Sequence, residues 1–495
     1  MNITQLIRSS LSYHWRMNVA VALGVLAGTA VLTGALLVGD SVRGSLKHLA
    51  LDGLGTIEQT LVVDKFFRVE LAKNVEPAVP AILLQSTLTQ PDAKRRADRV
   101  TILGCDQFKT LGGTADLAAT ITKGEIILNE PLARGLNATA GQDVIVRLPV
   151  PSDVPRDSPL GRKTETTSSV RLKVKAVIPA EGLGRFSLHP NQVAPLNAFV
   201  GLEELQNALQ QEGKANAIFA TGSNDDSAVS VAQRLTDALK PSLADLGLFV
   251  QPVKRTSDQG EYLLIGSKHM LLDAPANQSA DKLVKEQQLT AQPILTYLAN
   301  YVKAGPSDRG KVAYSTITAL DPLAAAPLGP FVGLDGKPLA TLPDDTIVIT
   351  RWLYDDLAKQ GVTLQPGDPI KLEFFEPEST HGKVLERTVS LRLHAVVDLT
   401  GAVADRDFTP ELKGVTDEDS IADWNPPFPY DPKRVRTTKP NDIDEQYWDT
   451  HRATPKAFVS LATGRKLWES RFGRTTAIRV APPSGVNAES LADQW

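Results

Sequence analysis

One stretch near the start of the chain constrains its fold more than any other. Residues 17–39 read MNVAVALGVLAGTAVLTGALLVG and hold no charged side chain, while Arg16 and Asp40 close the stretch on its two sides. As an α-helix the stretch would be about 35 Å long, because each residue adds about 1.5 Å. A helix of this length crosses a hydrocarbon core of about 30 Å with some tilt. The stretch therefore predicts one transmembrane helix in front of a long polar region.

Two other interpretations of the stretch stay open. A buried core helix would present a polar face, and the polar side chains available for one are Asn18, Thr29 and Thr33. A cleaved signal peptide would use Arg8 and Arg16 as its basic region and residues 28–30 as a small-residue cleavage site. The apolar run continues through Gly39, however, and so exceeds a normal signal-peptide core. We therefore favour the membrane helix.

Two glycines within the stretch indicate what this helix packs against. Gly24 and Gly28 have the small-xxx-small spacing that lets membrane helices approach one another closely. A helix that only anchors a protein does not need this spacing. The pair therefore predicts transmembrane packing against other membrane helices.

The residues before and after the stretch continue its helical pattern. Residues 1–16 place apolar side chains at helical spacing, which predicts either a short amphipathic helix at the membrane interface or a simple flank. Residues 40–55 continue the period outward, so the helix should extend to about residue 55 and end at Gly53 and Gly55. The basic residues on the two sides give only a slight bias, which places residues 1–16 in the cytoplasm.

Composition excludes several classes of function. The 53 basic and 57 acidic side chains balance, so there is no basic field for a nucleic acid to follow. The single cysteine, Cys105, cannot form an internal disulfide, and the seven histidines are scattered singly, without the spacing of a metal site. The sequence also lacks a P-loop and the common hydrolase motifs. We therefore expect no catalytic residue, no metal site and no cofactor.

An internal duplication is the most informative pattern in the remaining chain. The segments 126–136, 141–146, 170–177, 198–202 and 217–220 recur, in the same order and with similar apolar spacing, at 347–357, 367–372, 389–396, 457–461 and 477–480. Residues 100–106 have a looser echo at 314–321. Each copy reads as strands with short helices between them, which predicts two α+β units over 57–250 and 251–495. Because the strands alternate, each sheet should cover one face with helices and present the other to water or to its neighbour.

The two copies differ in their insertions and in their ends. The first has a proline- and serine-rich excursion over 149–169 and continues into a predicted helix over 223–240. The second has a long insertion over 401–455, in which five aromatic residues favour a packed loop: Trp424, Phe428, Tyr430, Tyr447 and Trp448. The acidic residues 417–419 fit a solvated face better than a cation site. Since the second copy stops where the matching helix would be mid-length, we expect the chain to be the N-terminal portion of a longer protein.

These patterns together resemble a known family. The N-terminal segment LSYHWRMNVAVALGVLAGTAVLTGALLVGDSVRGSLKHLAL is similar to the start of an FtsX-like ABC transporter permease. The segments EIILNEPLARGL, GQDVIV, VRLKVKAVI and TPKAFVSL resemble the MacB-like periplasmic core domain of that family. The segments QPILTYLANYV and TPELKGVTDEDSIADWNPPFPYDPKRVR resemble a large bacterial subgroup of these permeases.

The resemblance implies an architecture and a set of partners. Such permeases have a first membrane helix, a large extracytoplasmic domain and further membrane helices, and this sequence lacks the later helices. They lie in the bacterial inner membrane, pair with a separate cytoplasmic ABC ATPase subunit and usually form dimers in contact with membrane lipid. Many export lipoproteins, lipids, peptides or drugs, or relay ATPase motion to periplasmic partners. The alternatives from other classes are a single-span anchored binding or scaffold protein and an extracytoplasmic enzyme delivered by a signal peptide.

Overall fold

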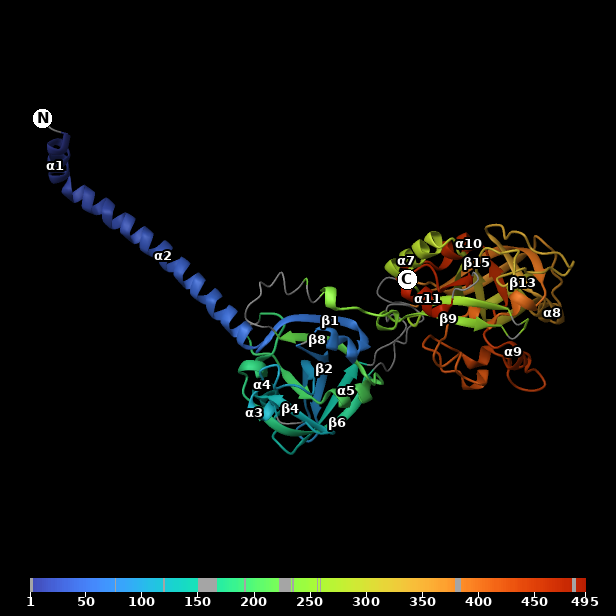
Figure 1. Cartoon of the computed structure of the whole chain (residues 1–495), viewed down its shortest axis with the longest axis horizontal. Coiled ribbons are helices and arrows are strands. Elements are labelled where there is room, and N and C mark those ends of the chain that lie inside the picture. The colour runs from blue at the N-terminus through green and yellow to red at the C-terminus, as the bar shows by residue number, and fades with distance from the viewer. Residues whose placement is uncertain are drawn as a thin grey trace. The chain divides into compact units, whose positions relative to one another are not determined.

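The computed structural model describes residues 3–75, 77–118, 121–149, 167–190, 193–221, 233, 236–255, 257–258, 260–378, 384–482 and 487–495. The chain divides into two compact units, shown in Figure 1. The first comprises the N-terminal helices with residues up to 149 and 167–240, and the second comprises 241–495. The division falls at 240/241 rather than the predicted 250/251. The reason is that β9 (Leu248–Lys254) pairs along its whole length with β10 (Glu261–Ser267), a strand of the second unit.

Two helices open the chain. The predicted amphipathic helix is α1 (Ile3–Tyr13), and the apolar stretch lies in α2 (Trp15–Asp52), which continues without a break to the predicted end at Gly53. The two helices are separated at His14, whose φ of −100° and ψ of 21° leave the helical region. No residue of either helix is buried. The alternative of a buried core helix is therefore wrong.

The first unit is built on one sheet that closes on itself. Its strands are β1 (Ile57–Arg68), β2 (Ala78–Gln90), β3 (Arg95–Gly104), β4 (Glu125–Asn129), β5 (Asp143–Pro149), β6 (Thr167–Ile178), β7 (Asn197–Val200) and β8 (Lys214–Thr221). They run in the order β1-β8-β2-β3-β7-β4-β6-β5, and β5 pairs again with β2. The strands from β2 to β5 thus form a ring, and β8 and β1 extend the sheet from the first half of β2. The short helices are η1 (Val69–Val75), α3 (Ala115–Ala118), α4 (Glu130–Leu136), η2 (Gly182–Arg185) and α5 (Leu202–Leu209).

The second unit repeats this topology. Its further strands are β11 (Thr290–Ala304), β12 (Gly310–Ala319), β13 (Thr346–Thr350), β14 (Pro369–Phe375), β15 (Glu386–Val397), β16 (Ala457–Val459) and β17 (Ala477–Ala481). The order β12-β16-β13-β15-β14-β11 closes through a pairing of β11 with β12, and β17, β10 and β9 extend it. The helices are η3 (Leu243–Leu246), α7 (Ala274–Glu286), η4 (Pro306–Asp308), α8 (Arg351–Lys359), η6 (Gly401–Ala404), η7 (Arg406–Phe408), η8 (Ile421–Asp423), η9 (Pro432–Arg434), α9 (Ile443–His451), α10 (Leu461–Trp468) and α11 (Ala488–Gln494).

The duplication extends to individual contacts, and the predicted fold class of two duplicated α+β units behind one apolar helix is confirmed. The irregularity between Ile126 and Ile127, where β4 pairs with β6, recurs between Ile347 and Val348, where β13 pairs with β15. Equivalent carboxylates hold equivalent helices. Asp106 accepts a hydrogen bond from the backbone N–H of Leu202 at 2.9 Å, and Asp321 accepts one from the N–H of Leu461 at 3.3 Å.

One expectation about the sheets is wrong. The central strands do not present one face to water, because both faces are buried. In β4, Ile126 and Leu128 join the core formed with α4 and α5, while Ile127 joins a second core on the opposite face. In β13, Ile347 and Val348 divide in the same way. Continuous apolar runs of this kind are typical of strands covered on both faces.

The insertion over 401–455 is packed, as its aromatic residues predicted. Phe428, Tyr447 and Trp448 are buried. A fully buried ion pair fixes the start of the insertion to the sheet, because Arg479 of β17 donates to Asp405 at 2.8 Å. In the acidic run, Asp417 accepts hydrogen bonds from backbone N–H groups of its own turn, and the described residues contain no group of side chains able to hold a metal ion. The predicted excursion over 149–169 and helix over 223–240 lie largely outside the described residues.

Candidate functional site

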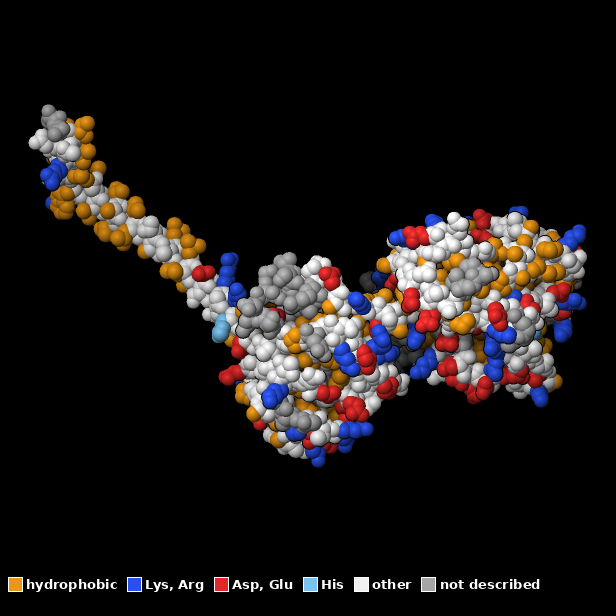
Figure 2. Space-filling view, viewed as in Figure 1, with side chains coloured by type: hydrophobic (Ala, Val, Ile, Leu, Met, Phe, Trp, Pro, Cys, Tyr) orange, Lys and Arg blue, Asp and Glu red, His pale blue; other side chains and the backbone are white. Residues whose placement is uncertain are grey.

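The apolar half of α2 meets the requirements for a membrane span. Among the described residues, α2 is the one helix long and apolar enough to cross a membrane, with a mean hydropathy of 2.2 over its most apolar window. Figure 2 shows hydrophobic side chains along this half of the helix. The hydroxyl of Thr29 donates to the carbonyl oxygen of Val25 at 2.8 Å, so it needs no water partner. A span requires such internal satisfaction, because hydrocarbon offers no hydrogen bonds.

The two glycines predicted to pack lie on this exposed surface. A Cβ placed on Gly24 or Gly28 would meet no atom of the chain within 4 Å. The helix surface is therefore narrow and open at both positions. Their packing against another membrane helix stays a prediction.

The other end of α2 is fixed in the first unit. All 38 residues of the helix span about 57 Å, so the helix extends well beyond a hydrocarbon core of about 30 Å. At its last residue, the Asp52 carboxylate accepts a hydrogen bond from the backbone N–H of Gly182 at 3.0 Å. A Cβ on Gly53 would lie 2.8 Å from the carbonyl oxygen of Arg185, so this glycine lets the helix end approach η2 closely.

A second loop holds the chain just after the helix. Gly55 has a φ of +60°, and a Cβ there would lie 2.2 Å from the carbonyl oxygen of Leu111. The next residue, Thr56, donates its backbone N–H to Leu111 O at 3.3 Å and its hydroxyl to Thr110 O at 2.6 Å. Leu54 packs on the core that includes Leu111. The helix end is thus bound to two separate loops, which we call the helix junction (residues 52–56, 110–111 and 182–185).

Sequence reasoning found the helix end but not its partners. The pattern predicted Gly53 and Gly55 as the end of the helix, but it did not predict residues 182–185 as a segment that this end contacts. Nothing in the sequence links the two segments, which are far apart along the chain. Glycines at a helix end are also expected wherever a helix simply stops.

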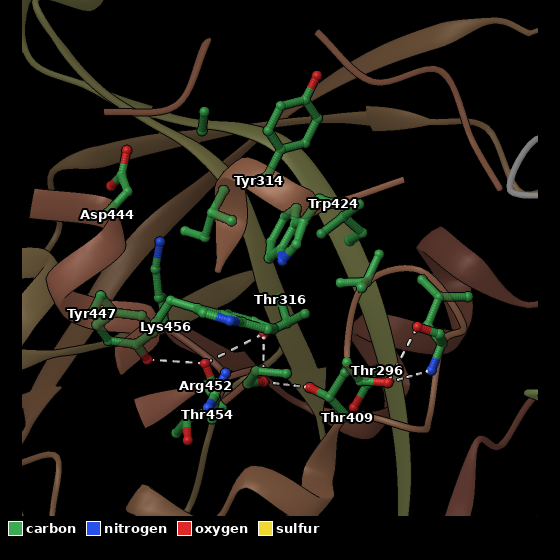
Figure 3. A pocket seen from close by; sticks show the side chains of 18 of the residues that line it. Thr296, Tyr314, Thr316, Thr409, Trp424, Asp444, Tyr447, Arg452, Thr454 and Lys456 are labelled. Atoms are coloured by element: carbon green, nitrogen blue, oxygen red, sulfur yellow. Dashed lines mark hydrogen bonds between the residues drawn. The ribbon is translucent and has the colours of Figure 1, made fainter. Parts of the chain in front are cut away.

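A separate cavity lies in the second unit, between the sheet and the insertion. It has a volume of about 70 Å³ and is mostly apolar. Strands β11 and β12 contribute Thr296, Tyr314 and Thr316, and the insertion contributes Trp424 and Trp448. Figure 3 shows these elements converging on the cavity, with Lys456 among the lining side chains.

Lys456 is the unusual member of this lining. Lys456 is only 6% exposed, and its Nζ lies 4.8 Å from the ring centroids of both Trp352 and Tyr447. Burial lowers the pKa of its amine, an effect that the charge of Asp444 opposes. Backbone hydrogen bonds on both sides, from Lys456 N–H to Thr316 O and from Thr350 N–H to Lys456 O, fix the direction of the side chain.

A neighbouring charge cluster holds the insertion to α8. Arg436 donates to both oxygens of Asp356, at 3.0 and 2.8 Å, and to both oxygens of Asp444. Burial opposes ionisation of Asp444, but the hydrogen bonds from Arg436 outweigh it and the pKa of this carboxyl is lowered. The Asp444 carboxylate is therefore held as an anion, and one guanidinium binds both carboxylates. This bidentate geometry is the strongest form of such pairing.

Sequence reasoning did not single out Lys456. A comparison of the two copies would have done so, because the equivalent position in the first copy is Asn197. The side-chain amide of Asn197 donates hydrogen bonds to Phe186 O at 2.9 Å and to Gly184 O at 3.3 Å. A lysine immediately before a buried strand, where the duplicate has a neutral residue, was the available signal.

The single cysteine of the chain is a buried core residue. Cys105 is fully buried, and burial raises the pKa of its thiol to about 12. The thiolate is the reactive form of cysteine. Cys105 is therefore a core residue at neutral pH.

Several solved structures resemble part of the chain weakly. No protein-family model matches the chain, and no curated protein matches it. The periplasmic region of MacB from Actinobacillus actinomycetemcomitans is 13% identical over 38% of this chain and 85% of that one, with a TM-score of 0.24. The extracellular domain of the noncanonic ABC-type transporter YknZ from Gram-positive bacteria is 13% identical over 37% of this chain and 92% of that one, with a TM-score of 0.24. Structural similarity at a TM-score of 0.24 is too weak to support an inference about this chain.

Proposed function

We propose that the chain is a permease subunit of an ABC-type exporter or mechanotransmission complex. Residues 1–16 lie in the cytoplasm, residues 17–39 cross the inner membrane, and both α+β units lie outside the cytoplasmic membrane. ATP hydrolysis takes place on a separate ATPase subunit, and this chain itself is not an enzyme. The sequence resemblance to FtsX-like permeases supports this proposal.

The helix junction is the observation that carries the proposal. The apolar part of α2 continues without a break into a segment whose end is bound to two loops of the first unit. A tilt of the helix in the membrane therefore displaces these loops. A flexible tether would be enough for a protein that is only anchored, whereas a helix bound at its end transmits movement.

The glycine pair gives the helix a partner within the membrane. Gly24 and Gly28 leave a narrow surface on which another helix, from the same chain type in a permease dimer, approaches closely. The two glycines therefore support assembly of the permease.

Site-specific photocrosslinking in native bacterial membranes tests the proposal. A photoreactive amino acid replaces Ser9, an exposed residue of α1, and a second variant carries it at Glu203, an exposed residue of α5. We expect an ultraviolet-dependent adduct with a P-loop ATPase from position 9 and none from position 203. An adduct with the ATPase from position 203 alone would place the first unit in the cytoplasm and contradict the proposed orientation. Absence of an ATPase adduct from Ser9 and from other exposed positions of α1 would leave the single-span scaffold as the better account.

A further inference from the structure

The first helix carries an apolar face that no other part of the described chain covers. Four apolar residues recur at i, i+3, i+4 and i+8, which places them on one side of α1: Ile3, Leu6, Ile7 and Leu11. Each of these residues is more than half exposed. Figure 2 shows hydrophobic side chains gathered along one side of this helix. The opposite side holds most of the polar residues of α1: Thr4, Gln5, Arg8, Ser9 and Ser12.

A helix of this length is not stable in water by itself. α1 has 11 residues, and isolated helices shorter than about 12–15 residues are marginal in water. Most helical stability in proteins comes instead from the packing of an amphipathic face. Because no residue of α1 is buried, the described part of the chain does not supply that packing. The helix therefore depends on another surface, and that surface must be apolar.

The neighbouring span places a membrane surface within reach of α1. α1 ends at Tyr13, and α2, which contains the uncharged stretch, begins at Trp15. A helix of 11 residues is about 16 Å long, so all of α1 stays within about 20 Å of the point at which α2 enters the membrane. His14 leaves the helical region between the two helices, so α1 does not have to continue along the axis of α2. Tyrosine and tryptophan are enriched at membrane–water interfaces, and here they flank the break. α1 can therefore lie along the surface that α2 crosses.

The charges of this segment indicate an anionic surface. From Ile3 to Gly39 the sequence contains two arginines, Arg8 and Arg16, and no acidic residue. At about 100° per residue, Arg8 lies about 120° from the centre of the apolar face, and its long side chain extends to the level of the headgroups. Arg16 lies beside the span, with its guanidinium 5.6 Å from the ring centroid of Trp15. An anionic phospholipid leaflet offers both the apolar layer and the negative charge that this segment complements.

We propose that α1 lies in the plane of the cytoplasmic leaflet and binds anionic phospholipids such as phosphatidylglycerol. Its apolar face enters the boundary between headgroups and acyl chains, about 5–10 Å deep, and Arg8 and Arg16 contact the lipid phosphates. Ser10 also lies on the apolar side, and a shallow position of this kind tolerates it. Ser9 faces the cytoplasm. With α1 bound to lipid and the helix junction bound to the first unit, α2 is held at both ends.

The inference rests on one part of the proposed function, which is the placement of residues 1–16 in the cytoplasm beside a membrane span. It requires neither an ATPase partner nor a permease dimer. Because its tests use this chain alone in a defined bilayer, their failure is distinguishable from the absence of an ATPase adduct in native membranes.

Spin labels on the full chain in lipid nanodiscs test the position of α1. Single cysteines carry the label at Ile7 and Leu11 on the apolar side and, as matched controls, at Ser9 and Ser12 on the polar side. Cys105 is fully buried and should contribute little label. We expect the labels at positions 7 and 11 to be relaxed by oxygen, which concentrates in the acyl layer, and to be protected from a water-soluble nickel complex. The labels at positions 9 and 12 should behave in the reverse way. No residue of α1 is buried, so these substitutions should leave both units folded.

Fluorescence quenching tests the preference for anionic lipid. A fluorophore on Ser10→Cys is quenched by phosphatidylglycerol or by phosphatidylcholine that carries the same acyl-chain nitroxide, in nanodiscs of otherwise equal composition. We expect the anionic lipid to be preferred by about fivefold for each arginine that contacts a headgroup, the factor that corresponds to about 1 kcal/mol. Arg8→Gln and Arg16→Gln should each lower this preference, and the double variant should abolish it. The matched control is Arg134→Gln, which removes an exposed arginine of α4 and should leave the preference unchanged.

Four results would overturn the proposal. One is equal exposure of the labels at positions 7 and 9 to the nickel complex, which would place α1 in water. The second is protection of positions 7 and 11 from both oxygen and the nickel complex, which would show that protein, such as a second copy of the chain, covers the apolar face. The third is equal quenching by the two lipids when both arginines are present. The fourth is an unchanged lipid preference in the double variant that lacks them.

Discussion

Replacing Gly55 with alanine should release the end of α2 from the first unit while leaving that unit folded. Gly55 has a φ of +60°, and the added Cβ would lie 2.2 Å from the carbonyl oxygen of Leu111. A carbon atom normally stays about 3.3 Å from a carbonyl oxygen, so the two segments must separate by roughly 1 Å. The backbone hydrogen bond from Thr56 N–H to Leu111 O is already 3.3 Å long and would be lost.

The expected magnitude follows from two contributions. A left-handed backbone costs a residue with a Cβ about 1–2 kcal/mol, and forcing an extra atom into a packed contact costs about 1–3 kcal/mol. The junction should therefore lose about 2–5 kcal/mol of stability against local opening. This is below or comparable to the total stability of a typical domain, about 5–15 kcal/mol, so local release is expected before global unfolding.

Hydrogen exchange measures this opening directly. Because about 1.4 kcal/mol corresponds to a factor of ten, exchange of the Thr56 and Gly182 amides should become faster by between about 30-fold and several thousandfold. Amides of β3 should keep their protection. The matched control is Gly213→Ala, since Gly213 has a φ of +68° but a Cβ there would meet nothing within 4 Å. The close contact at Leu111 would be refuted if the Thr56 amide exchanged at the same rate in Gly55→Ala as in Gly213→Ala, or no faster than in the unaltered protein.

Three further predictions concern the second unit, the acid stability of the first unit and the membrane segment. Asp405→Ala leaves the buried guanidinium of Arg479 without its carboxylate partner, so calorimetry should show a free energy of unfolding about 3–5 kcal/mol lower. The control Asp345→Ala breaks an exposed ion pair and should change the free energy of unfolding by less than about 1 kcal/mol. Hydrogen bonds from Lys175 and Thr122 lower the pKa of Glu125 to about 2. The ionised Glu125 carboxylate therefore contributes its full share of folding stability above the unfolded pKa of 4.5, and this share is lost as the pH falls toward 2. Glu125→Gln should flatten the plot of unfolding free energy against pH in this range, and an unchanged plot would contradict the lowered pKa of Glu125. Leucine at both Gly24 and Gly28 should reduce co-purification of differently tagged copies, whereas Gly34→Leu, on another face of α2, should not; normal assembly and ATPase-coupled activity of the double variant would count against helix packing.

The sequence was sufficient where local patterns determine structure. The uncharged stretch predicted the apolar part of α2, and the glycines after it predicted the helix end. The recurring segments predicted two copies of one fold, because each copy repeats the same alternation of apolar residues and the same capping positions. Asn129 and Thr350, for example, cap equivalent helices by accepting the backbone N–H three residues on.

Long-range closure could not be predicted in this way. The ring forms because β2 pairs with β5 through Thr87–Thr89 and β11 pairs with both β12 and β14, and no local pattern encodes these partners. The same holds for the contact of Gly55 with Leu111. Lys456 was missed because a lone lysine in a sequence normally indicates a solvated position. Its difference from Asn197 in the first copy was the available signal, and the packed insertion is what buries it.

Cysteine accessibility across the membrane tests the central claim that α2 spans the membrane and carries both units to its outer side. Single cysteines replace Ser9, Glu203 and Lys359, exposed residues of α1, the first unit and the second unit. The buried Cys105 should contribute little background, because its thiol stays protonated. With an impermeant maleimide on intact bacterial spheroplasts, we predict labelling at positions 203 and 359 and none at position 9 until the membrane is permeabilised. Labelling at position 9 together with protection of 203 and 359 would contradict the claim.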